Sequence, residues 1–377
     1  MLRRLCAIAA LLCVAGGAAA AAPTPPAQPA HGPGGADYRH HEVIASLHGK
    51  GATQFWLFEP RSPAPLSAPV IVFLHGWGGI SPDPYRAWID HIVKRGNIVV
   101  YPRYQADLLT PVAEFTPNAT AAVLDALELL RSDATRVPPD FARFALVGHS
   151  MGGALCANLA ARAQRDGLPA VRAFMSVQPG KTWMVPRRAA IVFEDLAQVP
   201  ADTLILAVAG DRDRLARDVD AKRIYYETTQ VSPANKNFVL VRSDSYGSPP
   251  LEAHHFSPLA RSGARAPALS QGRQVSEVRE RMLERGGARG DVLPDPTRTE
   301  EREGREDGEL PDVGFEFVTT PDALDFYGYW KLFDALTDAA FYGRNREYAL
   351  GNTPQQRSMG VWSDGRPVQE LLIPARP

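Results

Sequence analysis

The chain has 377 residues, of which 45% are hydrophobic and 22% are charged, and its formal net charge is −1. This length allows one large domain or two smaller ones, each with a substantial core. The near-zero net charge argues against nucleic acid as a partner and against electrostatic binding to acidic membranes.

The first 22 residues have the pattern of a secretory signal peptide. Arg3 and Arg4 precede an apolar stretch from Leu5 to Val14, and a run of small residues from Ala18 to Ala22 follows. The apolar stretch is short and alanine-rich, which favours a cleaved signal over a retained membrane anchor. We therefore expect an exported protein, secreted or periplasmic, with no stable membrane span after cleavage.

Residues 23–36 are rich in Pro, Ala and Gly, and we expect them to form a disordered linker because such a segment contributes little to a core. Cys6 and Cys13 belong to the signal, so Cys156 is the one cysteine of the mature chain. The mature monomer therefore cannot form an internal disulfide. Cys156 falls on an expected helix, where it should be a buried apolar residue.

The rest of the chain, residues 37–377, is predicted to form a single domain. Eight short β-rich runs alternate with helical or loop stretches, and the later runs are continuously apolar, as in strands buried on both faces of a parallel sheet. The predicted strands are 42–47, 53–59, 70–74, 98–101, 144–147, 174–178, 204–208 and 238–241. A Gly-Lys-Gly turn predicts a hairpin for the first two. The pattern indicates an α/β fold with a mostly parallel eight-stranded sheet flanked by helices.

A glycine-rich turn follows the strand at 70–74, where residues 75–79 read His-Gly-Trp-Gly-Gly. Such a turn lets backbone N–H groups approach a substrate oxygen that is becoming negatively charged. We assign the two donors of this oxyanion hole to Trp77 and to Met151, the residue after the candidate nucleophile.

The candidate nucleophile is Ser150, within residues 148–153, which read Gly-His-Ser-Met-Gly-Gly directly after an apolar strand. A Gly-x-Ser-x-Gly motif between a strand and a helix is typical of a serine on a sharp, strained turn. Its glycines remove Cβ atoms that would collide with neighbouring backbone. The following helix directs its N-terminal N–H groups at the reaction centre. The alternative is a glycine-rich turn with an ordinary serine.

A serine hydroxyl needs a base within hydrogen-bond distance, and in this arrangement an acid and then a histidine follow on the loops after later strands. Two acids, Asp211 and Asp213, follow the strand at 204–208. Asp213 is preferred because it lies three residues beyond Gly210, just past the strand end. The other acid is expected to cap the loop or face solvent.

Two adjacent histidines, His254 and His255, follow the strand at 238–241, and the base is expected to be one of them. The base takes the serine proton during attack and the acid orients its ring. His75 and His149 are expected to hold structure rather than to transfer protons. The nine histidines show no metal-ligand spacing, so we predict neither a metal nor any other cofactor.

Residues 259–312 interrupt the pattern, since they contain no aromatic residue and are crowded with Arg, Glu, Asp and Gly. We predict a flexible insertion with one short helix near Ser276–Arg285, and a mobile lid over the site is the alternative. From Pro321 to Gly343, apolar residues recur every three or four positions and predict an amphipathic helix that packs on the sheet. Residues 359–368 should form a turn that closes the fold.

Together these motifs resemble the serine α/β-hydrolases, in the branch that includes dienelactone-hydrolase-like esterases, platelet-activating-factor acetylhydrolase-like enzymes and cutinase-like polyester hydrolases. The polyester hydrolases share the Gly-His-Ser-Met-Gly-Gly string and the His-Phe-x-Pro string at residues 255–258. The resemblance implies the α/β-hydrolase fold, a base at His255, an acid at Asp213 and an aromatic oxyanion residue at Trp77. The polyester hydrolases also carry a C-terminal disulfide, which this mature chain cannot form. We therefore expect the substrate to be a small or medium ester rather than a polymer.

We therefore expect an exported serine hydrolase that cleaves carboxylic esters through an acyl-serine intermediate. Its partner would be a small-molecule or lipid-like ester, and its oligomeric state is left open. The alternatives are an acyltransferase that uses the same three residues, a peptidase, and a catalytically inactive binding protein of the same fold. Intact candidate residues argue against the last.

Overall fold

The computed structural model describes residues 21–180, 190–262 and 318–377. The predicted signal peptide lies almost entirely outside these residues, and so does the predicted helix at 276–285. Of the helices in the described part of the chain, none is both long and apolar enough to cross a bilayer.

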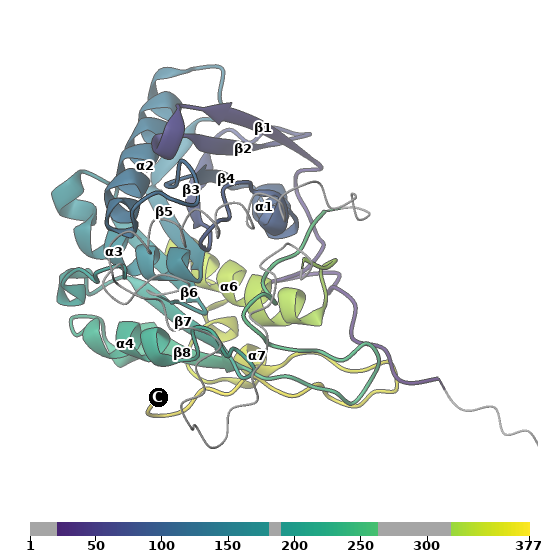
Figure 1. The fold of residues 1–377 in the computed structure, drawn as a ribbon. Coiled ribbons are helices and arrows are strands. Elements are labelled where there is room, and N and C mark those ends of the chain that lie inside the picture. Colours follow the sequence, from purple (N-terminus) through teal and green to yellow (C-terminus); the bar gives the residue numbers. More distant parts are fainter. Residues whose placement is uncertain (1–20, 181–189, 263–317) are drawn as a thin grey trace, which may run out of the picture.

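All eight predicted strands are present, and they form one sheet in the order β1-β2-β4-β3-β5-β6-β7-β8 (Figure 1). The strands β3 to β8 are parallel to one another, whereas β2 is antiparallel to both β1 and β4, so β1 and β2 form the predicted hairpin. Their bounds are β1 Glu42–His48, β2 Phe55–Arg61, β3 Ala68–Leu74, β4 Ile98–Pro102, β5 Pro139–His149, β6 Val171–Val177, β7 Leu204–Gly210 and β8 Lys236–Val241.

Helices cover both faces of this sheet (Figure 1). On one face lie α2 (Phe115–Ser132), α3 (Met151–Asp166) and α4 (Val219–Glu227), and on the other lie α1 (Arg86–Lys94) and α6 (Lys331–Tyr342). Successive side chains of a strand point to opposite faces, so a strand covered on both sides must be apolar throughout. In β3, for example, Val70, Val72 and Leu74 join the core under α2 and α3, and Ile71 and Phe73 join the core under α1 and α6.

The predicted C-terminal helix is confirmed, with one local difference. Residues Leu324–Trp330 form a π-helical segment, α6 continues from it to Tyr342, and Gly343 ends the helix with a φ of +67°. Beyond the short helix α7 (Pro354–Arg357), the tail closes the fold as expected. There Trp362 is buried and donates from its indole N–H to Asp244, and Leu372 pairs with Leu240 in β8.

The first residues of the predicted insertion belong to the domain. Leu259 and Ala260 are buried, and Ala260 forms a bridge to Thr319 on the far side of the residues that the structure leaves undescribed. The prediction that the flexible insertion begins at residue 259 is therefore wrong for residues 259–262. Residues 263–312 lie outside the described part of the chain.

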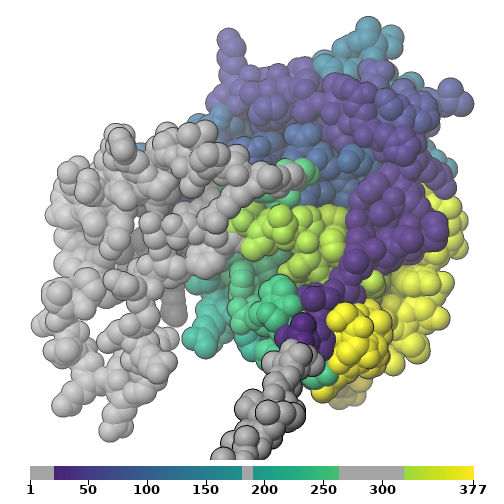
Figure 2. All heavy atoms as spheres, turned by 90° about the vertical axis from the view of Figure 1, so that its right-hand side faces the viewer, coloured from purple at the N-terminus to yellow at the C-terminus, as the bar shows by residue number. Residues whose placement is uncertain are grey.

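The prediction of a disordered linker at residues 23–36 is also wrong. Figure 2 shows the N-terminal segment, in purple, lying against the yellow C-terminal tail and the light-green helices. Its backbone is hydrogen-bonded to the domain: the carbonyl of Pro23 accepts from Ser248, and that of Thr24 accepts from Ser363. A Pro- and Gly-rich segment has few side chains to bury, but its backbone groups still form hydrogen bonds where a folded surface offers partners.

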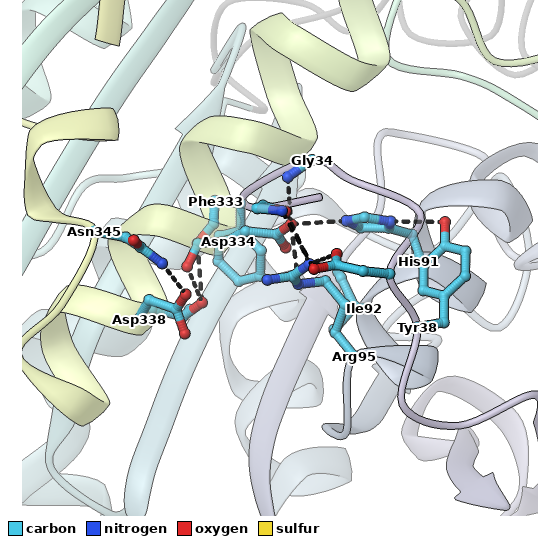
Figure 3. Close-up of polar contacts among 12 residues, drawn as sticks. Gly34, Tyr38, His91, Ile92, Arg95, Phe333, Asp334, Asp338 and Asn345 are labelled. Carbon is cyan, nitrogen blue, oxygen red and sulfur yellow. Dashed lines mark hydrogen bonds and ion pairs between the residues drawn. The ribbon is translucent and has the colours of Figure 1, made fainter. Parts of the chain in front are cut away.

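The last contact of this segment is with a buried carboxylate, that of Asp334 in α6. Its Oδ2 accepts from the N–H of Gly34 at 2.7 Å, from Nε2 of His91 at 2.8 Å and from Nε of Arg95 at 3.1 Å (Figure 3). Burial alone would raise the pKa of Asp334, but the charges of Arg95 and His91 and these hydrogen bonds lower it below its ordinary value. Asp334 therefore joins the N-terminal segment to α1 and α6.

Replacing this carboxylate should destabilise the fold. We expect Asp334→Asn to lower the free energy of unfolding by roughly 3 kcal/mol in urea titrations, because the buried His91 and the partly buried Arg95 lose the carboxylate that they share. The matched control is Glu128→Gln, the same chemical change in an exposed pair with Arg131, which should cost less than about 1 kcal/mol. Equal effects of the two changes would refute the assigned role of Asp334.

The same variant gives a pH test. Because the pKa of Asp334 is lower in the folded than in the unfolded chain, its contribution to stability is full above the ordinary aspartate value of about 3.9. That contribution is lost as the pH falls through the lower, folded value. The stability difference between the wild type and Asp334→Asn should therefore narrow in acid, and a constant difference would contradict this account.

Candidate active site

Ser150 occupies a strained turn between the end of β5 and the start of α3. Its φ is +56° and its ψ is −123°, a conformation that residues other than glycine seldom adopt. The N–H of Ser150 donates to the carbonyl of Val177 in β6 at 3.0 Å, and its carbonyl accepts from the N–H of Gly153 at 2.9 Å. Backbone hydrogen bonds on both sides of Ser150 therefore hold the turn in its strained conformation.

The two glycines that flank Ser150 are required by close packing. A Cβ atom at Gly152 would lie 2.0 Å from the carbonyl oxygen of Leu74 at the end of β3. A Cβ atom at Gly148 would lie 2.3 Å from the carbonyl oxygen of Gly152. These contacts are with backbone, which cannot move aside as a flexible side chain can. They explain the spacing of the motif, as the sequence predicted.

Gly152→Ala should therefore destabilise the protein strongly. The added methyl group overlaps the backbone of β3, and we expect a loss above the 1–3 kcal/mol or so that overpacking of a core ordinarily costs. Gly167→Ala, at the other end of α3, is the matched control, because its φ is +76° and a Cβ atom there meets open space. The control should lose about 1–2 kcal/mol from backbone strain alone. Urea unfolding that ranks the two variants equally would contradict the packing argument.

The structure brings Ser150, His255 and Asp213 together, although they come from three separate loops. Nε2 of His255 lies 3.0 Å from Oγ of Ser150, and its Nδ1 lies 2.8 Å from Oδ2 of Asp213. Asp213 follows β7, and His255 follows β8. All three residues are buried, with at most 5% of their surface exposed. Because neighbouring parallel strands end at the same edge of the sheet, these loops meet beside the start of α3.

The carboxylate of Asp213 is held in place and kept ionised. Its Oδ1 accepts from the N–H groups of Leu215 and Ala216, at 2.8 and 3.0 Å. Burial alone would raise the pKa of Asp213, but the hydrogen bond and charge of His255, together with these two N–H groups, lower it below its usual range. Asp213 is therefore an anion that faces the imidazole of His255.

The alternative acid, Asp211, and the alternative histidine, His254, have other hydrogen-bond partners. Asp211 accepts from both the N–H and the hydroxyl of Ser243, so it braces the start of the segment that leads to the histidines. The imidazole of His254 accepts from the N–H of Phe256, and its carbonyl accepts from Gln178. Of the two acids, Asp213 contacts His255, and of the two histidines, His255 contacts Ser150; these are the members that the sequence preferred.

The glycine-rich turn after β3 lies next to Ser150. A Cβ atom at Gly76 would be 3.3 Å from the Cβ of Ser150, and the N–H of Gly78 donates to Oε1 of the buried Gln105. Trp77 is partly buried and packs against the core, and Met151 is the fully buried first residue of α3. The turn that contains Trp77 and the first residue of α3, Met151, thus lie on either side of Ser150.

His75 and His149 are both buried, and each contacts a backbone carbonyl. The ring of His75 is stacked on Tyr104 with centroids 4.1 Å apart, and burial lowers its pKa to about 4. His149 contacts the hydroxyl of Tyr85 and the backbone carbonyl of His255. Tyr85 was not among the residues that the sequence singled out. It belongs to no motif and meets His149 across 64 positions of the chain, so no local signal could have found it.

Two other expectations concern metal ions and the cysteine. Among the residues that the structure describes, no group of three or more His, Cys, Asp or Glu side chains is placed to hold a metal ion. Cys156 is a free, fully buried residue on α3, which confirms the prediction of an apolar packing role.

The sheet order and the serine turn between β5 and α3 define the class of fold: the protein has the α/β-hydrolase fold, with a mostly parallel eight-stranded sheet flanked by helices. A comparison with protein families agrees, because residues 71–222 match a family described as alpha/beta hydrolase fold.

Among solved structures, the chain is similar to a thermostable esterase from Pseudomonas putida and to a doubly substituted esterase variant. Each is 18% identical with a TM-score of 0.40, and each alignment covers 53% of this chain and 72% of the other. A search of curated proteins finds no match.

Proposed function

We propose that the protein is a serine hydrolase that cleaves carboxylic esters through an acyl-serine intermediate. The observation that supports this most strongly is the continuous set of contacts from Asp213 through His255 to Ser150, with the serine on a strained turn at the start of a helix. In this proposal Ser150 is the nucleophile, His255 the general base and acid, and Asp213 the residue that orients the imidazole.

The proposed reaction has two halves. Nε2 of His255 takes the proton of Ser150 as Oγ attacks the ester carbonyl, and the imidazolium then returns the proton to the leaving alcohol as the acyl-serine forms. In the second half, water gives a proton to His255 and attacks the acyl group, and the imidazolium then returns that proton to Oγ of Ser150 as the bond to the acyl group breaks and the acid is released. The anionic Asp213 stabilises the imidazolium in both halves.

The proposal assigns the oxyanion hole to the backbone N–H groups of Trp77 and Met151. The closeness of Gly76 to Ser150 and the position of Met151 at the start of α3 support this assignment. Donors fixed before the reaction stabilise a developing oxyanion without reorganisation, and each contributes roughly a hundred- to a thousand-fold in rate.

We further propose export, with residues 1–22 removed, and a small or medium carboxylic ester as substrate. The charged, apolar and small-residue parts of the N-terminal sequence support export. The mass of the exported chain should correspond to loss of that segment, and a mass that retains it would overturn this part of the proposal.

The substrate class is tested with p-nitrophenyl esters of increasing acyl length, beside the matching p-nitroanilides. We expect the esters to be hydrolysed, short and medium chains best, and the amides much more slowly, because an amine is the poorer leaving group. Methanol added to the assay separates hydrolysis from acyl transfer, since a transferase would yield mainly the methyl ester. A folded protein that hydrolyses none of the esters would overturn the proposed function.

A further inference from the structure

Three hydrogen bonds link the turn after β3, the serine turn and the histidine loop behind the candidate active site. The N–H of Gly76 lies 2.9 Å from the hydroxyl oxygen of Tyr85. That hydroxyl lies 2.9 Å from Nδ1 of His149, and Nε2 of His149 lies 2.8 Å from the carbonyl oxygen of His255. One chain of contacts thus joins the residue before Trp77, the residue before Ser150 and the backbone of the candidate base.

The direction of every bond in this chain is determined by its two ends. The N–H of Gly76 can only donate and the carbonyl of His255 can only accept. Nε2 of His149 must therefore bear the proton that it shares with His255, and in the neutral ring Nδ1 is then an acceptor. Tyr85 then accepts from Gly76 and donates to His149. A single tautomer of His149 satisfies all three bonds.

Both side chains remain neutral at ordinary pH. Each is 2% exposed. Burial raises the pKa of Tyr85, and burial together with the nearby His255 lowers the pKa of His149 to about 3. The rings of His149 and His255 have centroids 4.9 Å apart, so a charged donor here would oppose the imidazolium that the proposed reaction forms. A neutral imidazole can hold the His255 carbonyl without that penalty.

We propose that Tyr85 and His149 are positioning residues that hold the backbone of His255 so that its Nε2 faces Ser150. Because the same chain ends on Gly76, it also sets the distance between the candidate oxyanion turn and the base. This inference rests on the proposed function. Neither side chain needs to touch the substrate, and their effect on the reaction passes through His255 and the turn at Gly76.

The test compares the rate at which a fluorophosphonate labels Ser150 in three variants. This probe reports the reactivity of the serine whether or not an ester is hydrolysed. Tyr85→Phe removes the donor to His149, His149→Leu removes the whole link, and His149→Gln retains an N–H donor near the position of Nε2. We expect labelling to fall by on the order of a hundred-fold in the first two, the typical cost of a misplaced reacting group, and to be partly restored in His149→Gln.

A matched control exists elsewhere in the fold. Tyr38 and His91 form a second tyrosine–histidine pair, with the hydroxyl 3.0 Å from Nδ1, beside Asp334 and outside the candidate active site (Figure 3). Tyr38→Phe removes the same kind of contact, so it should reduce thermal stability and leave the labelling rate unchanged. If Tyr85→Phe does not fold, His149→Gln and His149→Leu still separate the two outcomes.

The labelling and hydrolysis measurements together separate this inference from the proposed function. Variants that are less stable yet react with the probe at the wild-type rate would show that Tyr85 and His149 only support the fold, and would overturn the inference while the proposed function stands. Wild type that is labelled at Ser150 but hydrolyses no ester would overturn the proposed substrate class alone, because the labelling comparison still tests the inference. A wild type that is not labelled at Ser150 would overturn both.

Discussion

Replacing Ser150 with alanine is expected to reduce the hydrolysis of activated esters by on the order of a million-fold, the loss known for removal of the nucleophile from a serine hydrolase. The reason is that the hydroxyl of Ser150, on its strained turn, is the group that lies 3.0 Å from Nε2 of His255. Removal of the hydroxyl also removes a small buried group without leaving a large cavity, so the variant should fold. Initial rates with a short-chain p-nitrophenyl ester measure the effect.

Ser176→Ala is the matched control for this change. Ser176 is fully buried in β6 and donates its hydroxyl to the carbonyl of Gly153, so it is also a serine close to the turn. Its loss should cost about 1 kcal/mol of stability, the usual net contribution of a hydrogen bond, and leave most of the activity. Substantial ester hydrolysis by Ser150→Ala would contradict the assignment of the nucleophile.

Asp213→Asn is expected to lower kcat by about ten-thousand-fold, as the corresponding change does in other serine hydrolases. An amide can donate to Nδ1 of His255, which would place the proton on Nε2 and leave no base facing Ser150. Asp211→Asn is the same chemical change two residues earlier. An asparagine there can still accept from Ser243, so activity should change little. The opposite ranking in steady-state kinetics would reverse the assignment.

The adjacent histidines give the second half of this prediction. His255→Ala removes the imidazole that contacts both Ser150 and Asp213, and it should cost nearly as much activity as loss of the serine. His254→Ala removes an acceptor for the N–H of Phe256, and it should have a much smaller effect, mainly on the shape of the loop. Similar losses from the two variants would mean that the loop, rather than one imidazole, matters.

Most of the fold could be predicted because its strands are fully buried. A strand such as β3 must be apolar on both faces, and that requirement appears directly in the sequence as an unbroken run. Positions immediately after such strands could also be predicted, because the carboxyl ends of parallel strands meet at one edge. Ser150, Asp213 and His255 were predicted from the loops after such strands, with the family resemblance deciding between the two histidines, and the structure brings the three side chains together.

The remaining features depend on partners that are distant along the chain. Residues 23–36 have few side chains to bury, and the contact of Gly34 with Asp334 joins positions 300 residues apart. The contact of Tyr85 with His149 spans 64 residues and follows no repeat or spacing. Local composition describes what a segment can bury by itself, and it does not describe the hydrogen-bond partners that a folded surface supplies.

Trapping of the acyl-enzyme tests the central claim most directly. The protein would be mixed with p-nitrophenyl acetate, quenched in acid during turnover and digested with a protease. Mass spectrometry would then give the masses of its peptides. The account predicts one acetyl group per chain on the peptide that contains Ser150, and none at that site in Ser150→Ala. Ester hydrolysis with the acetyl group on another residue, or steady turnover from which no acetylated Ser150 peptide is recovered, would contradict it.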